Sequence, residues 1–353
     1  MRERVALRIR LPAPVTREHQ STRARAIGIH ASHEQFGPGR LLRLMQAAEA
    51  AGFDAGMCSD HWAPWSEAQG QSGFAWSWLG AALQATSMSF GVVNAPGQRY
   101  HPAIIAQAAA TLAVMFPRRF WVALGSGQLL NEHITGGRWP PKAVRHARLR
   151  EAADIIRRLW AGETVTHAGH VTVSEATLWT RPDVPPMLVG AAVTPQTAAW
   201  VAEWADALIT VVQPEDQLDR VLDAFRTHGG AGKPVLLQVH LAYAPTEAEA
   251  RDAAFTAWRQ NTLDNSVMTS LVHPAQIAAA AAHVRREDMD AAVWISADPE
   301  WFVARIQREL ARGFDRLYLH EVGPEQERFV EVFGREVLAH CAPPPDRAGR
   351  SRI

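Results

Sequence analysis

A short segment at residues 59–65 (SDHWAPW) carries residue types that could do chemistry. The side chain of His61, with an ordinary pKa of about 6.5, can take up or release a proton near neutral pH, and Asp60 beside it could orient a ring or a ligand. The indoles of Trp62 and Trp65 could wall a pocket and exclude water, although core filling accounts for most of the 13 tryptophans. The apolar run before the segment predicts a strand. Parallel-sheet enzymes hold their active sites at the carboxyl ends of strands, so the segment is a candidate catalytic site, with a capped turn as the alternative.

A second segment, residues 120–132 (FWVALGSGQLLNE), has the pattern of a strand that opens onto a glycine turn. Gly125 and Gly127 would let backbone amides come close to a ligand, and Ser126 and Asn131 could hydrogen-bond to it. A bare GxG is weak evidence of a dinucleotide site, and the rest of that fingerprint is absent, so NAD binding is not predicted. A plain tight turn is the alternative.

A third candidate lies where Gly190, Ala191 and Ala192 precede Thr194 and Pro195. Threonine followed by proline is typical of a helix start. Backbone amides at the amino end of a helix can bind a phosphate group. The stretch is therefore a candidate phosphate site, although an ordinary strand-to-helix turn has the same pattern.

Polar side chains recur at the predicted carboxyl ends of other strands, at His30, Asn94, His240, His320 and Glu321. If the strands form one barrel, all of these could face the same mouth. A metal-dependent hydrolase on such a barrel could take as ligands His30, His61, His240 and Asp60. The HxH pair that these enzymes often carry on the first strand is missing, so no metal is expected.

Alternating strand and helix patterns predict the elements that would position these residues. Eight strands are expected at residues 27–31, 55–59, 88–94, 120–125, 187–191, 207–212, 235–241 and 316–320. Helices are expected at residues 39–50, 103–115, 143–161, 217–228 and 299–312. Eight strand–helix units close a barrel, so the expected fold is a (β/α)8 TIM barrel of the α/β class. Residues 163–179, as a hairpin, and 246–289, as a helical segment, would be insertions after strands.

The composition is that of a globular protein with a large core. Of 353 residues, 47% are hydrophobic and 20% are charged, and the formal net charge is zero. No run reaches the roughly 18 apolar residues of a membrane span, and the scattered arginines form no basic stripe for nucleic acid. Cys58 and Cys341 fit no CxxC pattern, which favours a cytoplasmic setting. One barrel is expected at residues 26–342, between a disordered extension or early start at 1–25 and a flexible tail at 343–353.

With these motifs in view, the chain resembles the bacterial luciferase-like (LLM class) oxidoreductases, and within them the branch of the F420-dependent glucose-6-phosphate dehydrogenases. The matching stretches are residues 28–32, 59–65, 99–107, 125–132 and 313–315. Residues 131–136 and 138–143 resemble a narrower clade that is regarded as using FMN. The resemblance thus implies a flavin-type cofactor, with FMN as the first expectation and coenzyme F420 as the alternative.

The resemblance also implies where the cofactor would lie. Its ring would lie near Asn94, Gln128 and Asn131, and its phosphate near residues 190–194. Thr210 lies beside a position where relatives have a threonine. The expected cofactor-binding residues are Asp60, Asn94, Gly125, Ser126, Gly127, Gln128, Asn131, Gly190, Ala191, Ala192 and Thr210.

Two departures from this branch concern the substrate. Its sugar-phosphate enzymes have a glutamate where this chain has Gln128, and an amide has no proton to give, so Gln128 would only orient by hydrogen bonds. Those enzymes also place a lysine and an arginine on the substrate phosphate, where this chain has residues 211–214 (VVQP) and 291–294 (AAVW). A small, non-phosphorylated substrate is therefore expected.

The sequence thus predicts an FMN-dependent oxidoreductase that transfers a hydride between the flavin and a small organic substrate. The expected catalytic residues are His61, Asp60, Trp65 and Gln128, with His61 handling the proton. The alternatives are an F420-dependent oxidoreductase, a monooxygenase supplied with reduced flavin by a partner reductase, and a flavin-binding protein without turnover. A homodimer is expected by analogy with the family.

Overall fold

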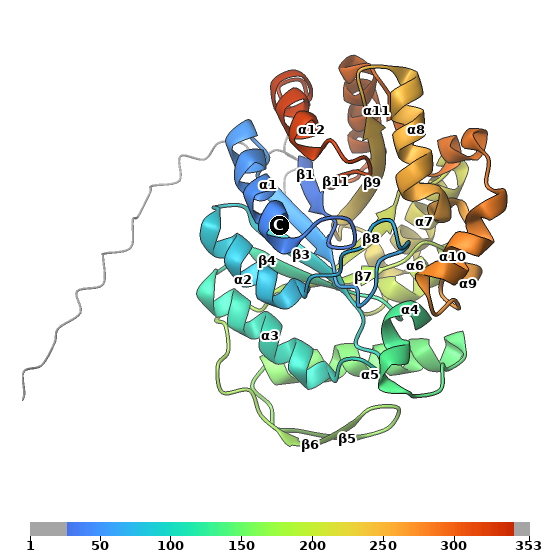
Figure 1. Ribbon diagram of the computed structural model, residues 1–353. Coiled ribbons are helices and arrows are strands. Elements are labelled where there is room, and N and C mark those ends of the chain that lie inside the picture. The colour runs from blue at the N-terminus through green and yellow to red at the C-terminus, as the bar shows by residue number, and fades with distance from the viewer. Residues whose placement is uncertain (1–26, 342–353) are drawn as a thin grey trace, which may run out of the picture.

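The computed structural model describes residues 27–341, in which eight parallel strands form a closed barrel (Figure 1). In barrel order the strands are β1 (Ile27–Ala31), β2 (Ala55–Ser59), β3 (Ser89–Asn94), β4 (Phe120–Leu124), β7 (Met187–Ala191), β8 (Ala207–Val211), β9 (Val235–Tyr243) and β11 (Arg316–Glu321). The pairings of β8 with β9, β9 with β11 and β11 with β1 close the circle. The expected TIM barrel is confirmed, with every predicted strand present. The expectations for residues 1–25 and 343–353 lie outside the described residues.

Helices cover the outside of the barrel (Figure 1). They are α1 (Pro38–Ala51), α2 (Ala75–Ala85), α3 (Pro102–Met115), α5 (Lys142–Trp160), α6 (Pro195–Ala202), α7 (Glu215–Phe225), α11 (Pro299–Arg312) and α12 (Gln326–Val332). Proline lies in the first turn of α1, α3, α6 and α11, where its missing N–H costs no hydrogen bond. Helices α1 and α11 end at Gly52 and Gly313, both with left-handed backbones. Helix α2 has neither signal, and it was not predicted.

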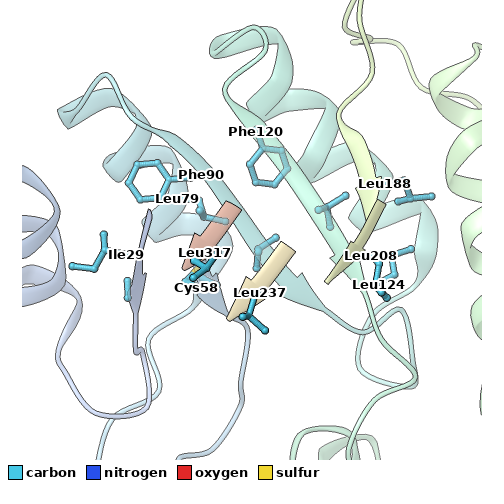
Figure 2. Close-up of a cluster of buried hydrophobic side chains, with 14 of the residues drawn as sticks. Ile29, Cys58, Leu79, Phe90, Phe120, Leu124, Leu188, Leu208, Leu237 and Leu317 are labelled. Carbon is cyan, nitrogen blue, oxygen red and sulfur yellow. The ribbon is translucent and has the colours of Figure 1, made fainter. Parts of the chain in front are cut away.

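Side chains along the strands alternate between an outer and an inner core, as the pleat of a strand requires. The outer set packs against the helices, and Figure 2 shows part of it, including Cys58, Phe90, Phe120, Leu188 and Leu208. The inner set fills the barrel and consists of Ala55, Met57, Trp121, Ala123, Val189, Ala207, Ile209, Leu236 and Tyr318. The barrel is therefore packed solid beneath its carboxyl-terminal mouth.

Two aromatic side chains in the barrel interior depend on glycines opposite them. A Cβ atom at Gly91 would lie 1.9 Å from Cε2 of Trp121, and one at Gly28 would lie 2.6 Å from Cδ1 of Tyr318. The indole N–H of Trp121 donates to the Tyr318 hydroxyl at 3.0 Å. The two glycines thus make room for a hydrogen-bonded aromatic pair that supports the base of the mouth.

The insertions follow the sequence prediction, with one addition. Strands β5 (Val165–Ala168) and β6 (Thr172–Ala176) form the expected antiparallel hairpin, at the lower edge of Figure 1. The expected helical segment contains α8 (Glu247–Trp258), α9 (Asn265–Met268) and α10 (Pro274–Ala280), and α4 (Leu129–Glu132) follows β4. Strand β10 (Trp294–Ser296), which pairs with β9 in parallel, was not predicted, because three residues are too short for a recognisable strand pattern. Within the described part of the chain, none of the helices has the length and apolar character that crossing a bilayer requires.

Candidate active site

A cavity of about 1040 Å³ opens at the carboxyl ends of the barrel strands. Each of the eight strands, or the loop after it, contributes to its wall. The predicted site residues that border it are Asp60, His61, Trp65, Asn94, Gly125, Ser126, Gly127, Gln128, Asn131, Ala191, Ala192, Thr194 and Thr210. His30, His240 and His320 border it as well. The structure thus brings these residues together, while their roles in binding and catalysis stay predictions.

Gly190, a predicted cofactor residue, lies away from the cavity wall. Because side chains alternate along β7, Ala191 faces the barrel mouth and Gly190 faces α6. A Cβ atom at Gly190 would lie 2.2 Å from Cγ1 of Val201 in that helix. The glycine therefore allows α6 to pack closely on the strand, and its predicted place in the phosphate site stays a prediction.

Two other residues singled out in the sequence also lie off the cavity. The carboxylate of Glu321 accepts the backbone N–H groups of Tyr243 and Gly323 at 2.8 Å and 2.7 Å. Burial raises the pKa of Glu321 to about 8. Trp62 is 55% exposed and does not border the cavity. Glu321 thus joins the end of β9 to the loop after β11. Of the two tryptophans in the segment, Trp65 is the one whose indole packs against His61.

His61 faces a carboxylate that the sequence analysis did not identify. Its Nδ1 atom lies 3.1 Å from Oε1 of Glu34, and the Glu34 side chain is only 2% exposed. Glu34 accepts the hydroxyl groups of Ser59 at 2.5 Å and Ser32 at 3.1 Å. The Trp65 indole packs edge-on against the imidazole, with ring centroids 4.7 Å apart. Nδ1 of His61 thus lies within ion-pair distance of Glu34 without making a hydrogen bond to it, and the ring also interacts with the backbone of Ala63.

The charges of this pair are set by their surroundings. Burial lowers the pKa of His61 below its usual value of 6.5, and Arg99 lowers it further, while the Glu34 carboxylate opposes both. Burial alone would raise the pKa of Glu34, but His61, His30 and the Ser59 hydroxyl together outweigh it, and the net shift is downward. At neutral pH an ionised Glu34 therefore lies beside a neutral His61, which is the state in which the imidazole can accept a proton.

The carboxylate of Asp60 is held by three side chains. Asn94 Nδ2 donates to Oδ2 at 2.7 Å, the Tyr100 hydroxyl donates to Oδ1 at 3.3 Å, and Arg99 Nη2 lies 3.4 Å from Oδ2. Arg99 also donates to the Asp60 backbone carbonyl at 2.5 Å. The Asp60 side chain is 0% exposed. Asp60 thus joins the loops after β2 and β3, and its buried carboxylate is suited to positioning these loops.

The loop after β4 completes this frame. Asn131 Oδ1 accepts the backbone N–H of Trp62 at 2.8 Å, and its Nδ2 donates to Gln128 Oε1 at 3.3 Å. The fully buried Glu132 accepts the backbone N–H groups of Arg99, at 2.8 Å, and Gln98. Asn131 thus holds the His61 loop, and its expected contact with a cofactor stays a prediction. Within residues 27–341, Gln128 Nε2 has no hydrogen-bond partner.

Histidines form the wall below the mouth. The His30 and His320 rings lie 4.4 Å apart, and His240 lies 5.4 Å from His320. Burial lowers the pKa of His30 to about 4 and that of His240 to about 3. Amides of Gln238 and Asn261 lie 3.3 Å and 3.1 Å from the ring nitrogens of His240. This wall is therefore polar and uncharged at neutral pH. Within residues 27–341, no group of three or more histidines, cysteines and carboxylates has the arrangement of a metal site.

The residues around the cavity fit a flavin-type ring. Asn94 Oδ1 is buried and has no hydrogen-bond partner, because the Nδ2 end of the amide faces Asp60. It could accept a ring N–H. Gly127 has a left-handed backbone with φ of +83°, so the turn after β4 needs a glycine there. Thr194 caps α6 by accepting the N–H of Thr197. The N–H of Ala192 in the loop before it donates to the Ile209 carbonyl at 3.0 Å and is therefore not available to a phosphate.

Sequence reasoning missed Glu34, Arg99, Tyr100 and Glu132. Glu34 lies three residues beyond the end of β1, and the turn in which Ser32 accepts two backbone N–H groups directs it back under the mouth. Its position after a predicted strand was a usable signal. Arg99 and Glu132 lie within stretches that carried the family resemblance, so their types were visible. Their pairing partners depend on the approach of separate loops.

Cations are scarce around the cavity. Within the described residues, the arginine and lysine side chains that border it are Arg99, which is paired with Asp60, and Lys142 at the start of α5. Val211, Gln213 and Ala291, which come from the two stretches expected to differ from the sugar-phosphate enzymes, border the cavity. The substrate class expected from them stays a prediction.

Comparison with known proteins adds to this geometry. A family model described as luciferase-like monooxygenase matches residues 18–316. An F420-dependent glucose-6-phosphate dehydrogenase from Microbacterium testaceum is 35% identical over 323 residues, which cover 88% of this chain and 96% of the relative. A protein of the same name from Mycobacterium tuberculosis is 31% identical over 321 residues, with coverage of 87% and 95%.

Solved structures give the same fold. An F420-dependent secondary alcohol dehydrogenase, in complex with an F420-acetone adduct, superposes with a TM-score of 0.82 and 29% identity, covering 90% of this chain and 99% of the other. The coenzyme F420-dependent tetrahydromethanopterin reductase from Methanopyrus kandleri gives a TM-score of 0.72 at 20% identity, with coverage of 90% and 99%. The second likeness supports the fold alone.

Proposed function

This chain belongs to the luciferase-like monooxygenase family and is an oxidoreductase, and from that premise we propose that it transfers a hydride between a deazaflavin of the F420 type and a small uncharged alcohol or carbonyl compound. The observation that carries the proposal is the pair of His61 and Glu34 at the cavity wall, 3.1 Å apart. Such a pair can move one proton for each hydride that is transferred.

Coenzyme F420 takes the place of FMN as the favoured cofactor. The relatives at 35% and 31% identity, and the solved structure at 29%, have F420 in their names. Support for FMN comes from the resemblance of residues 131–143 alone. The ring systems of the two cofactors have similar shapes, so Asn94 and the glycine turn after β4 would suit either ring.

The bound cofactor would supply the hydride acceptor or donor. The protein would supply a base for the hydroxyl proton of an alcohol, and we assign this to the imidazole of His61. Glu34 would keep Nδ1 oriented and stabilise the imidazolium that forms. Trp65 would exclude water beside the ring, because its indole covers the imidazole edge-on. Gln128 could only position the substrate or cofactor through its free amide donor.

The cavity favours a neutral substrate. The histidine wall of His30, His240 and His320 is uncharged at neutral pH and can both donate and accept hydrogen bonds, as a hydroxyl group requires. A sugar phosphate would find no cation on the sides of β8 and β10. We therefore do not propose glucose 6-phosphate, which is in the names of the relatives, as the substrate of this chain. A secondary alcohol, as named for the solved structure, could hydrogen-bond to the histidine wall.

A direct assay tests the proposed function. Purified protein is mixed with F420 or FMN, and loss of the oxidised cofactor's visible absorbance is followed with 2-propanol, glucose or glucose 6-phosphate. We expect F420 to be reduced, with a neutral alcohol preferred over the phosphorylated sugar by about tenfold or more, the effect of one missing charged contact. Reduction by glucose 6-phosphate alone would overturn the substrate class. Binding of FMN but not F420 would overturn the cofactor, and oxygen uptake with supplied reduced flavin would favour the monooxygenase with a partner reductase.

The pH dependence of alcohol oxidation tests the link between His61 and Glu34. Oxidation needs neutral His61, so kcat/KM should fall as the pH falls through a pKa below 6.5. The Glu34 charge raises that pKa, so Glu34→Gln should move the acid limb to lower pH. It should also lower the plateau by roughly tenfold or more, because the ring loses its orienting partner.

A serine variant provides the control for this shift. Ser32→Ala removes one hydrogen bond to Glu34 but keeps the carboxylate, so its acid limb should stay near that of the wild type. If the limb does not move in Glu34→Gln, or moves to higher pH, Glu34 does not set the protonation of His61.

A further inference from the structure

A second cavity, of about 250 Å³, lies at the other end of the barrel. It is bordered by Arg226 directly after α7, by residues 230–233 and Val235, and by Arg312 and Gly313 at the end of α11. Val235 is the first residue of β9, whereas His240, further along the same strand, borders the active-site cavity. The two cavities are therefore separate, and the proposed function makes no use of the second.

The wall of this second cavity is positively charged. Arg226, Lys233 and Arg312 border it, and the bordering residues within the described part of the chain include no carboxylate. The active-site cavity differs in this respect, since carboxylates such as those of Glu34 and Asp60 lie in its wall. Cations without acids at a cavity wall favour an anionic ligand.

Of the three cations, Arg312 contributes the least net charge, because acids surround its guanidinium. Its Nε atom lies 2.8 Å from Oε2 of Glu309, and its Nη2 atom lies 3.5 Å from Oε2 of Glu215. Its Nη1 atom also pairs with Asp219. The charge of the wall therefore comes mainly from the other two side chains.

Arg226 and Lys233 have no ion-pair partner among residues 27–341, and their contacts are with backbone carbonyls. Nη2 of Arg226 donates to the carbonyls of Arg312 and Gly313, both at 3.4 Å, and Nζ of Lys233 donates to the Ala202 carbonyl at 2.7 Å. An ammonium group has three N–H donors and a guanidinium has five. Two N–H groups of Lys233, and Nε and Nη1 of Arg226, are thus left for a ligand.

The loop between α7 and β9 leaves this wall uncovered. Gly229 and Gly232 have left-handed backbones, with φ of +105° and +80°, which favour glycine. A Cβ atom at Gly232 would have no atom within 4 Å, and Ala231 beside it is exposed. Because residues 229–232 are three glycines and an alanine, no large side chain of this loop lies over Lys233.

The volume of the cavity limits the kind of anion. Pockets for organic ligands of drug size are typically about 300–1,000 Å³, so 250 Å³ suits a smaller anion. A phosphate group has several acceptor oxygens and up to two negative charges, which suit two cations with free N–H donors. We infer that the second cavity binds a phosphate group through Arg226 and Lys233, as the free ion or as part of a small phosphate monoester.

Calorimetric titration with inorganic phosphate tests this site. The full-length protein in low-salt buffer is titrated with phosphate, with glycerol 3-phosphate, and with chloride at the same ionic strength. We expect saturable phosphate binding with a dissociation constant on the order of 1 mM, as for a few charge-assisted contacts at a half-buried site, and no saturable binding of chloride. Tighter binding of glycerol 3-phosphate than of phosphate would identify a monoester as the ligand, and the reverse would identify the free ion.

Two substitutions of the exposed Ala231 separate charge from folding. Ala231→Glu adds a carboxylate at the cavity wall, so it should weaken phosphate binding by about tenfold or more. Ala231→Gln has nearly the same shape without the charge and should bind phosphate as wild type does. Lys233→Gln should resemble Ala231→Glu. Lys142→Gln, which removes the other lysine of the chain from the active-site cavity, should resemble wild type.

The outcomes that would overturn the inference are specific. Loss of phosphate binding in Lys142→Gln, with binding kept in Lys233→Gln, would place the phosphate in the active-site cavity. Equal binding by Ala231→Glu and Ala231→Gln would show that the second cavity holds no anion. Absence of saturable binding by wild type would also overturn it. None of these results bears on the proposed hydride transfer, which is tested by the assay with F420 and a neutral alcohol.

Discussion

Replacing His61 by alanine should reduce turnover by about 100-fold or more, while cofactor affinity stays within about tenfold of wild type. The reason is that the neutral His61 ring borders the cavity beside the Glu34 carboxylate, whose Oε1 atom lies 3.1 Å from Nδ1 and can stabilise the imidazolium. Asp60 cannot substitute for it, because its carboxylate is already bound by Asn94, Tyr100 and Arg99. Steady-state kinetics with the neutral alcohol, and fluorescence titration of the cofactor, measure the two quantities.

An exposed histidine outside the site serves as the control for this variant. His340 lies near the end of the described chain, far in sequence from the mouth, and His340→Ala should keep wild-type rates. An unchanged rate in His61→Ala would remove the ring from the mechanism. A loss of cofactor affinity well beyond tenfold in His61→Ala would show that the ring binds the cofactor rather than moving a proton.

Gly91→Ala should destabilise the fold by at least about 3 kcal/mol, the upper range for overpacking a core. The new Cβ would lie 1.9 Å from the Trp121 indole, so the ring or the strand must move. That shift would also strain the hydrogen bond from Trp121 to Tyr318, which is 3.0 Å long. We expect Tm to fall by roughly 4 °C or more in calorimetry, since an unfolding entropy of about 2.1 cal/mol/K per residue gives about 1.5 °C for each kcal/mol in a chain of this length.

Two further variants show whether the loss comes from this contact. Gly80 lies inside α2, and a Cβ there would lie 3.9 Å from Leu112 Cδ2, so Gly80→Ala should be neutral or stabilise by about 0.5–1 kcal/mol. Trp121→Leu added to Gly91→Ala should recover part of the loss, because the smaller side chain leaves room. An unchanged Tm in Gly91→Ala would mean that the indole does not pack against β3.

The barrel could be predicted because each strand is an apolar run followed by a helical pattern, and each step is local in the sequence. Proline and glycine marked the boundaries of helices such as α1 and α11 for the same reason. Helix α2 begins at Ala75 and is preceded by Phe74, which provides no capping side chain, and β10 has three residues. Neither has a local signal, so both depend on packing against the completed barrel.

The structure brings most of the predicted site residues to one cavity, whereas the contacts among them were not predicted. The rule that strand ends share one mouth placed His61, Asn94 and Gln128 around one cavity. The direction in which a strand residue faces was harder to predict. Gly190 faces α6, whereas Ala191, one residue further along β7, faces the barrel mouth. The partner of His61 was missed because Glu34 reaches it through a turn, and sequence patterns do not show how turns meet in space.

The ties among the loops after β2, β3 and β4 have a consequence for how this protein could change its chemistry. Asp60, Asn131 and Glu132 lock these loops to one another, so half of the rim has its shape before anything binds. Residues 246–293 form another part of the rim, joined to these loops by contacts such as Leu129 N–H to the Thr269 carbonyl at 3.1 Å. A substitution in the loops after β2, β3 and β4 would therefore change the positions of His61 and the residues around it. New substrate preferences could instead accumulate in the inserted part, where the polypeptide is free to vary without disturbing the reaction it covers.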